Sequence, residues 1–167
     1  MFLTDKLKKT IFLSLCVVFS LALGFLESYI PLSGSFPGIR IGIANIVILA
    51  VIYIYSVKEG VLCAFLKSVL ALFMYSNLSS FTYSVFGSML SALGMGIFKN
   101  VKSLSPIGIS LIGSFLHITA QIIVAYISFS TYAVFYYYPY LLGVGIITGF
   151  INGYLVKLLL VKLERSI

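Results

Sequence analysis

The sequence contains very little charge. Only 9% of its 167 residues are charged, with 11 basic and 4 acidic side chains, whereas about 25% of the residues in an ordinary soluble domain are charged. Hydrophobic residues make up 61% of the chain, and the mean hydropathy is +1.16. This composition excludes a soluble globular domain, a disordered chain and a small secreted module held together by disulfides.

Acidic residues are especially scarce. The two that lie closest together in the sequence, Asp5 and Glu27, are 22 positions apart, so no Asp-Asp-x-x-Asp cluster can form. This absence excludes a magnesium–diphosphate site of the prenyl-synthase kind, and no G-x-x-x-x-G-K-[ST] phosphate loop occurs either. The sequence therefore argues against catalysis without deciding whether the chain is an enzyme, and any energised transport needs a partner that supplies the energy.

Cysteine and histidine are rare as well. Cys16 and Cys63 lie in separate apolar runs and His117 is the only histidine, so the spacings of a zinc site are missing. The basic residues are spread among the apolar runs and form no stripe, so the net charge of +7 does not indicate a nucleic-acid partner. We expect neither a metal nor a cofactor.

Long apolar runs dominate the rest of the chain. A membrane-spanning helix needs about 20 apolar residues, and these runs are continuous instead of alternating, which favours helices over a barrel. We predict an all-α integral membrane bundle that forms one polytopic domain over residues 1–167. Its six transmembrane helices are expected over residues 11–30, 39–55, 61–77, 81–98, 107–128 and 140–156, the last one preceded by an aromatic run at 132–138.

Basic residues alternate between the connections of these six spans. Every second connection or tail carries lysine or arginine, and the other three connections carry only Arg40. By the positive-inside rule, we expect both termini in the cytoplasm and a multi-pass protein of the cell membrane. The N-terminal lysines and the first apolar run also resemble a signal peptide, but the run is long and the cleavage signal is weak. The residues expected on the inner side are Lys6, Lys8, Lys9, Lys58, Lys99, Lys102, Lys157, Lys162 and Arg165.

Ionisable residues in or beside the spans are the most informative ones. A charge inside a membrane costs several kcal/mol and needs a partner or a water-filled cavity. At about 1.5 Å per residue, Glu27 and Arg40 both lie within about 6 Å of the outer surface, so we expect a direct or one-water contact between them. Lys67 enters from the inner side to a depth of about 9 Å, and its stem can reach the inner interface. We therefore prefer a Glu27–Arg40 pair to a Glu27–Lys67 pair.

Uncharged polar residues extend this cluster. Asn45 and Gln121 are expected about 9 Å below the outer surface and His117 near the midplane, with His117 and Gln121 on one helical face. That face is either a ligand site or an ordinary packing surface with satisfied polar groups, and the aromatic run is either an interfacial belt or a lid over a ligand. The candidate ligand-binding residues are Glu27, Arg40, Asn45, Asn77, His117, Gln121, Tyr136 and Tyr137.

Small residues recur at four-residue spacing and mark faces where helices can approach closely. In the fourth and sixth spans we expect these faces to pack inside the bundle. The small face of the first span leads toward Glu27 and is a candidate docking surface for a partner. Its residues are Cys16, Ser20 and Gly24.

Two segments carry a recognisable signature, LESYIP at residues 26–31 and PGIRIGIANIV at residues 37–47. A His117-x-x-x-Gln121 pair follows, and then an aromatic stretch from Phe135 to Pro139 before a glycine-rich last helix. Together these features resemble the Gx transporter family, which is also labelled heptaprenyl diphosphate synthase component I. The resemblance covers nearly the whole chain.

This resemblance implies a fold similar to the substrate-binding (S) subunits of energy-coupling-factor transporters, with six helices, cytoplasmic termini and a ligand site that opens outward. It also implies that a coupling subunit docks on small residues of the first helix, and that the ligand is a flavin, a vitamin or a quinone or isoprenoid precursor. The implied partners are the lipid bilayer, the small-molecule ligand, and either energising membrane and ATPase subunits or a soluble prenyl synthase subunit. The alternatives are a non-catalytic membrane subunit of a heptaprenyl diphosphate synthase and a structural subunit of a membrane redox complex.

Overall fold

The computed structural model describes residues 2–30 and 39–164, and within these two parts it is all-α, as predicted, with no strand. Residues 31 and 37–38 of the family-like signature, and Arg165 of the basic tail, lie outside the described residues. The helices are α1 (Phe2–Ser28), α2 (Asn45–Ile54), α3 (Val57–Met74), α4 (Leu78–Phe98), α5 (Pro106–Phe129), the 3-10 helix η1 (Tyr132–Tyr137) and α6 (Tyr138–Glu164).

Four of the described helices, α1, α4, α5 and α6, are long and apolar enough to cross a membrane. Their length and composition are those of a membrane protein. The other two helices differ from them. α3 carries Lys58, Glu59 and Lys67 within its 18 residues. α2 has only 10 residues, which at about 1.5 Å each reach across about half of a bilayer core that is about 30 Å thick.

The second predicted span is only partly helical, which corrects the expectation of a helix over residues 39–55. α2 begins at Asn45, and residues 39–44, called the extended segment below, run as non-helical chain into a turn. Gly42 has a φ of 89°, a conformation that side-chain-bearing residues rarely adopt. The run IRIGIANIV contains no proline, and its isoleucines continue into the apolar residues of α2, so hydrophobicity alone did not predict that the helix starts late.

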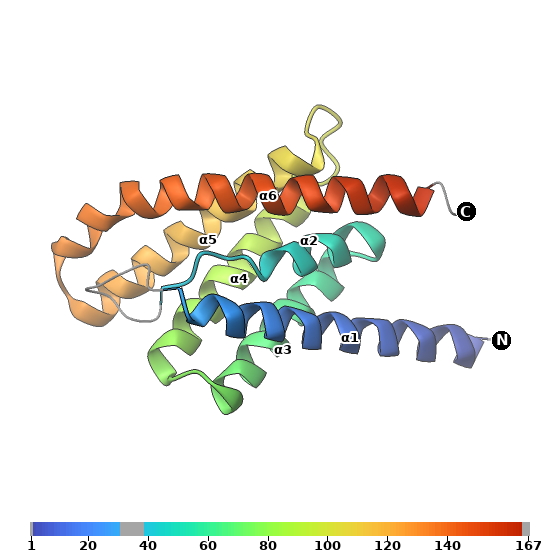
Figure 1. The fold of residues 1–167 in the computed structure, drawn as a ribbon, viewed down its shortest axis with the longest axis horizontal. Coiled ribbons are helices and arrows are strands. Elements are labelled where there is room, and N and C mark those ends of the chain that lie inside the picture. The colour runs from blue at the N-terminus through green and yellow to red at the C-terminus, as the bar shows by residue number, and fades with distance from the viewer. Residues whose placement is uncertain (1, 31–38, 165–167) are drawn as a thin grey trace.

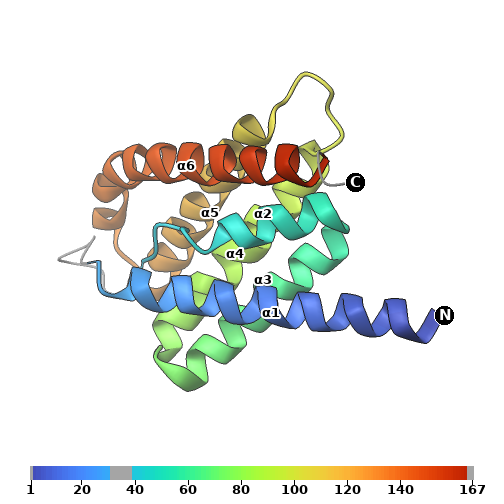
Figure 2. The same cartoon turned by 45° about the vertical axis from the view of Figure 1, so that its right-hand side comes forward.

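α2 lies between α1 and α6, with α3, α4 and α5 behind it in Figure 1, and the turned view in Figure 2 shows the same arrangement. α5 packs against α4 and α6, and α3 packs against α4 and α1. The extended segment enters α2 from inside this bundle, since Ile39, Ile41 and Ala44 are buried. Non-helical backbone therefore lies in the interior of an apolar bundle.

Small residues let α5 and α6 approach closely. A Cβ atom added at Gly153 of α6 would lie 2.5 Å from the Cα of Ile107, and one added at Gly145 would lie 2.1 Å from Cδ1 of Ile118. These distances confirm the internal packing predicted for the small residues of the last span.

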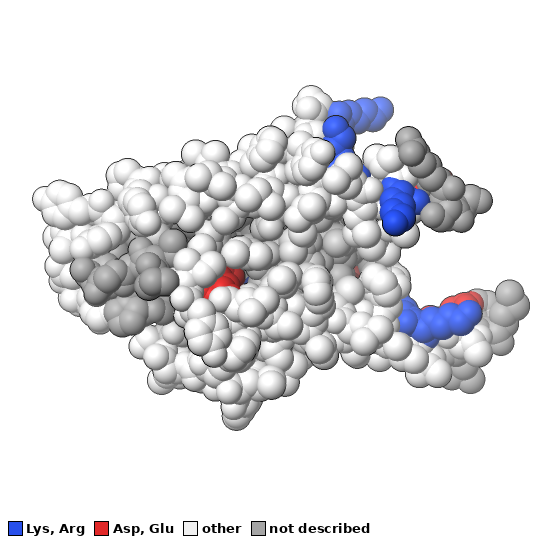
Figure 3. Space-filling model, viewed as in Figure 1, with Lys and Arg blue, Asp and Glu red and all other residues white. Residues whose placement is uncertain are grey.

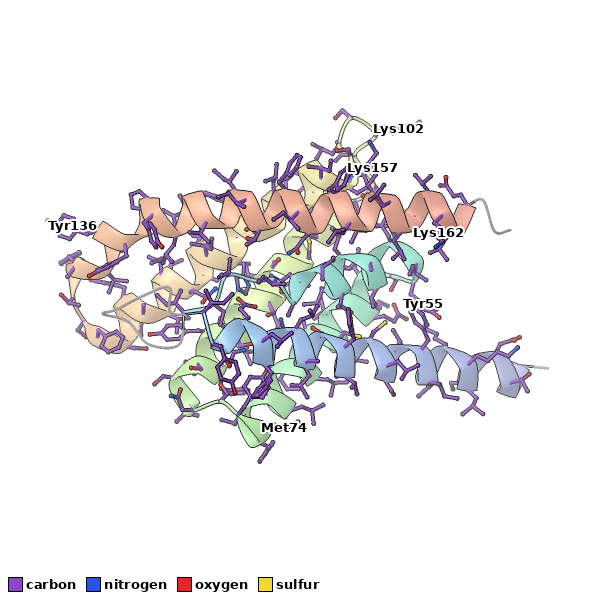
Figure 4. The ribbon with its side chains drawn as sticks, in the orientation of Figure 1. Tyr55, Met74, Lys102, Tyr136, Lys157 and Lys162 are labelled. Carbon is purple, nitrogen blue, oxygen red and sulfur yellow. The ribbon has the colours of Figure 1, made fainter. Side chains whose placement is uncertain are left out.

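Basic residues gather at one end of the molecule. Figure 3 shows lysine side chains at the end where both termini lie, and Figure 4 places Lys102, Lys157 and Lys162 there, with Tyr136 at the opposite end. The tails and the basic connections that the sequence assigned to one side therefore lie together in the fold.

Two lysines bind the ends of α2 and α3 to neighbouring parts of this end of the bundle. Lys9 of α1 forms an ion pair with Glu59 of α3 at 2.6 Å, and Lys99 after α4 donates to the carbonyl oxygen of Ile52 in α2 at 2.6 Å. Hydrogen bonds from Lys9 and Ser56 lower the pKa of the Glu59 carboxyl to about 2. The basic end thus has its own network of hydrogen bonds and ion pairs, separate from the network in the interior of the bundle.

Candidate ligand-binding site

The extended segment is held in place by side chains, first by Gln121 of α5. The Oε1 atom of Gln121 accepts a hydrogen bond from the backbone N–H of Arg40 at 2.7 Å, and its Nε2 donates to the backbone oxygen of Arg40 at 2.8 Å. Gln121 is completely buried. Its amide therefore supplies the two partners that the Arg40 backbone would otherwise find in a helix.

Side chains of α1 and α6 bond the following residues of the extended segment. From α1, Glu27 Oε1 accepts a hydrogen bond from the N–H of Gly42 at 2.6 Å, and Ser20 donates to the oxygen of Ala44 at 3.2 Å. From α6, Asn152 Nδ2 donates to the oxygen of Gly42 at 3.0 Å. Irregular backbone at membrane depth is tolerated only where it is buried in protein or lines a water-filled cavity. Here the backbone is buried and is bonded by three different helices.

A small cavity of about 10 Å³ lies beside the extended segment, which is room for about one water molecule. Three charged side chains line it, Glu27 from α1, Arg40 from the extended segment and Lys67 from α3. His117 of α5 completes the group. The cavity thus brings together ionisable residues from four parts of the chain that are far apart in sequence.

Arg40 and Glu27 face the same cavity but, although both are described residues, form no direct ion pair. The guanidinium of Arg40 donates to the oxygen of Gly24 at 3.3 Å and to Ser76 Oγ at 3.2 Å, and it lies 5.4 Å from the ring centroid of Tyr75. The direct form of the predicted Glu27–Arg40 contact is therefore wrong, because both groups have other partners. A contact through one water stays a prediction, since the cavity between them has room for it.

Lys67 occupies a different position from the expected one. It is only 7% exposed, lines the cavity with Glu27, and donates to Asn45 Oδ1 at 3.3 Å. The expectation that Lys67 reaches the inner interface is therefore corrected. α3 starts at Val57, earlier than the predicted span, and at about 1.5 Å per residue this places Lys67 about 15 Å along the helix.

His117 fills a slot between two glycines. It is 2% exposed, and among the described residues neither ring nitrogen has a hydrogen-bond partner in good geometry, although backbone atoms of Gly87 and Arg40 lie beside the ring. A Cβ atom added at Gly87 would lie 2.8 Å from Nδ1, and one added at Gly42 would lie 3.2 Å from Cδ2. A buried polar group without a partner is costly and rare in native proteins, so this imidazole is ready to bond to a group that enters the cavity.

Comparison with known proteins gives one family. The model of the family described as heptaprenyl diphosphate synthase component I matches residues 16–159. The chain belongs to this family. The matched region includes every residue of the cavity and of the extended segment, so the component I label that the sequence resembles is confirmed. No curated protein and no solved structure matches the chain.

Three residues predicted for the ligand site lie elsewhere in the structure. Asn77 is exposed and caps α4, where its Oδ1 accepts a hydrogen bond from the N–H of Ser80 at 2.8 Å. Tyr136 is 87% exposed at the end opposite the termini (Figure 4). Tyr137 packs against the apolar cluster that contains Ile39. The structure therefore brings together Glu27, Arg40, Asn45, His117 and Gln121, but not these three.

The predicted docking face of the first helix points inward. Ser20 is 1% exposed and bonds to the extended segment, and a Cβ added at Gly24 would lie 2.8 Å from the hydroxyl oxygen of Tyr75. Cys16 is partly buried. The expectation of an external docking surface is wrong for Ser20 and Gly24. The extended segment before α2 covers Ser20, and Tyr75 at the end of α3 covers Gly24.

Sequence reasoning missed four residues that shape the site. Thr148 and Asn152 of α6 bond to the oxygens of Ile41 and Gly42, at 3.4 Å and 3.0 Å. Gly42 and Gly87 make room for His117. The polar Asn152 inside the last apolar run was the available signal, since a buried amide in a spanning segment needs a partner.

The described residues contain no group of three or more His, Cys, Asp and Glu side chains that can hold a metal ion. Glu27 is the only carboxylate at the cavity. The site can hold and orient a polar ligand through hydrogen bonds and charge.

Proposed function

We propose that this protein is a membrane subunit of energy-coupling-factor type that binds a small molecule at the cavity beside the extended segment. The observation that carries the proposal is the extended segment itself, which is held by Glu27, Gln121 and Asn152 from three helices. Discontinuous spans whose unwound backbone lies at a binding site are typical of membrane transport proteins. The buried charges beside it are costly and therefore indicate function.

We further propose that the chain crosses the membrane six times, with the extended segment and α2 together forming the second crossing. The end of the molecule that carries the basic side chains faces the cytoplasm by the positive-inside rule, and both termini lie there (Figure 3). The cavity then opens toward the other side of the cell membrane.

The proposed ligand-binding residues are Glu27, Arg40, Asn45, Lys67, His117 and Gln121. The ligand is a flavin, a vitamin or a quinone or isoprenoid precursor, as the family resemblance implies, and energising membrane and ATPase subunits are the proposed partners. A cavity of about 10 Å³ holds only a water-sized group. Ligand entry therefore requires the side chains around the cavity to move apart.

Native mass spectrometry of the full chain, purified from membranes in mild detergent, tests this proposal. We expect the wild-type protein to retain a small molecule and Gln121→Leu to lose it, because the extended segment loses its fixed position. Ser128→Ala is the matched control on the same helix, since Ser128 is exposed, lies away from the cavity and donates to the oxygen of Val124 one turn earlier. A wild-type protein that carries no small molecule from any preparation would contradict the proposal.

A second function is favoured by the family description, which names a heptaprenyl diphosphate synthase. In that case the chain is the non-catalytic membrane subunit, and a soluble, Asp-rich subunit supplies the catalytic site. Co-purification with such a subunit, together with a changed prenyl-chain output after deletion of this chain, would support this function over transport.

A further inference from the structure

The charges that line the cavity do not balance. Arg40 and Lys67 are cations and Glu27 is the only anion among the lining residues, so with a neutral His117 the cavity has one excess positive charge. α2 begins at Asn45 beside it, and the first turn of a helix adds partial positive charge. An uncompensated charge inside a bundle is costly unless a counter-ion joins it.

Within the described part of the chain, two of these side chains also have unused hydrogen-bonding capacity. Lys67 has three N–H donors, and its hydrogen bond to Asn45 at 3.3 Å uses one. His117 has no partner in good geometry on either nitrogen among the described residues and is 2% exposed. By contrast, Arg40 bonds to Gly24 and Ser76, so its guanidinium is already engaged.

We propose, building on the function proposed above, that the polar group of the ligand is an anion, a carboxylate or a phosphate, bound between Lys67 Nζ and the ring of His117. A neutral imidazole donates one hydrogen bond and accepts one, so it pairs with an anionic oxygen through its N–H. Lys67 supplies the opposite charge, and charge-assisted bonds of this kind are stronger than neutral ones. A free small molecule and an anionic lipid headgroup share this chemistry.

The melting temperature of the purified full chain, titrated with sodium acetate or sodium phosphate against sodium chloride at equal ionic strength, tests the proposal. We expect a saturable rise with acetate or phosphate. Lys67→Met should weaken the apparent affinity by about tenfold or more, whereas Lys67→Arg, which keeps the charge, should stay within about threefold. Lys157→Met, an exposed lysine on α6 at the basic end (Figure 4), is the matched control and should bind like the wild type.

A second variant covers the case that Lys67→Met does not fold. His117→Leu fills the space between Gly42 and Gly87 with an apolar side chain that cannot donate a hydrogen bond to an anion. This variant should therefore also lose the saturable rise in melting temperature. The same titration in nanodiscs of phosphatidylcholine, with and without phosphatidylglycerol, separates the two sources. A free anion acts in both lipids, whereas a headgroup ligand gives a Lys67-dependent stabilisation only with phosphatidylglycerol, and either result supports the anion site.

Failure of this inference can be told apart from failure of the proposed function. If neither anion nor phosphatidylglycerol stabilises the wild type, but mass spectrometry finds a neutral molecule that Gln121→Leu loses, the anion site is wrong and the binding function stands. If no anion acts and no molecule is retained, both are overturned.

Discussion

Gly42 is needed for two separate reasons at the residue scale. Its φ of 89° is unfavourable for any other residue, and an added Cβ would lie 3.0 Å from Asn45 Nδ2 and 3.2 Å from His117 Cδ2. We expect Gly42→Ala to cost about 1–2 kcal/mol and to lower the melting temperature in detergent. Gly143→Ala is the control, because nothing lies within 4 Å of its Cβ and the helix gains up to about 1 kcal/mol. Equal stability of Gly42→Ala and the wild type would contradict the positive φ and the close packing at Gly42.

Gln121 gives a second test at this scale. Gln121→Leu leaves the N–H and the oxygen of Arg40 buried without their partners, at a cost of about 1–3 kcal/mol for each group. Thermal unfolding should show a clear loss of stability, whereas Ser128→Ala should unfold like the wild type. A Gln121→Leu protein that is as stable as the Ser128→Ala protein would show that the Arg40 backbone has other partners.

The sequence allowed several of these residues to be chosen in advance because polar groups in apolar runs need partners. This rule selected Glu27, Arg40, His117 and Gln121, which do meet around the extended segment. It failed for Asn77, because an asparagine just before a helix also has the local role of capping it. The estimated depth of an asparagine in the membrane does not distinguish a ligand-binding role from a helix-capping role.

At the scale of single elements, the sequence predicted which long helices exist but not where α2 and α3 begin. The long apolar helices α1, α4, α5 and α6 follow directly from hydrophobicity. The extended segment was not predictable, because its isoleucines suit a helix core and its hydrogen bonds come from residues up to 110 positions away, such as Asn152. The early start of α3 after the cap Ser56 likewise moved Lys67 from the expected edge to the cavity.

The α2–α3 connection gives a prediction about pH. The pKa of Glu59 is about 2 in the folded protein and about 4.3 when unfolded. A lowered folded pKa means that the Lys9–Glu59 pair stabilises the fold fully above the unfolded pKa, and that this contribution is lost as the pH falls toward 2. Between about pH 6 and pH 3, the melting temperature of the wild type should therefore fall more steeply than that of Glu59→Gln. Parallel profiles would contradict a role for this ion pair.

At the scale of the whole molecule, the positions of the basic residues give the orientation. The lysines of both tails and of two connections lie at one end of the bundle, and Tyr136 lies at the other (Figures 3 and 4). In a Cys16→Ala, Cys63→Ala background, Tyr136→Cys should react with a membrane-impermeant thiol reagent in intact cells. Lys102→Cys should react only after the cells are permeabilised. The reverse pattern would contradict cytoplasmic termini.

The whole account depends on the extended segment being buried and bonded inside the bundle, and hydrogen exchange followed by mass spectrometry measures this most directly. Although residues 39–44 are not helical, we expect slow exchange at the amides of Arg40 and Gly42, which donate to Gln121 and Glu27. Gln121→Leu should speed exchange in this segment and leave α4 unchanged. Exchange in the wild type as fast as in an open loop would contradict the account.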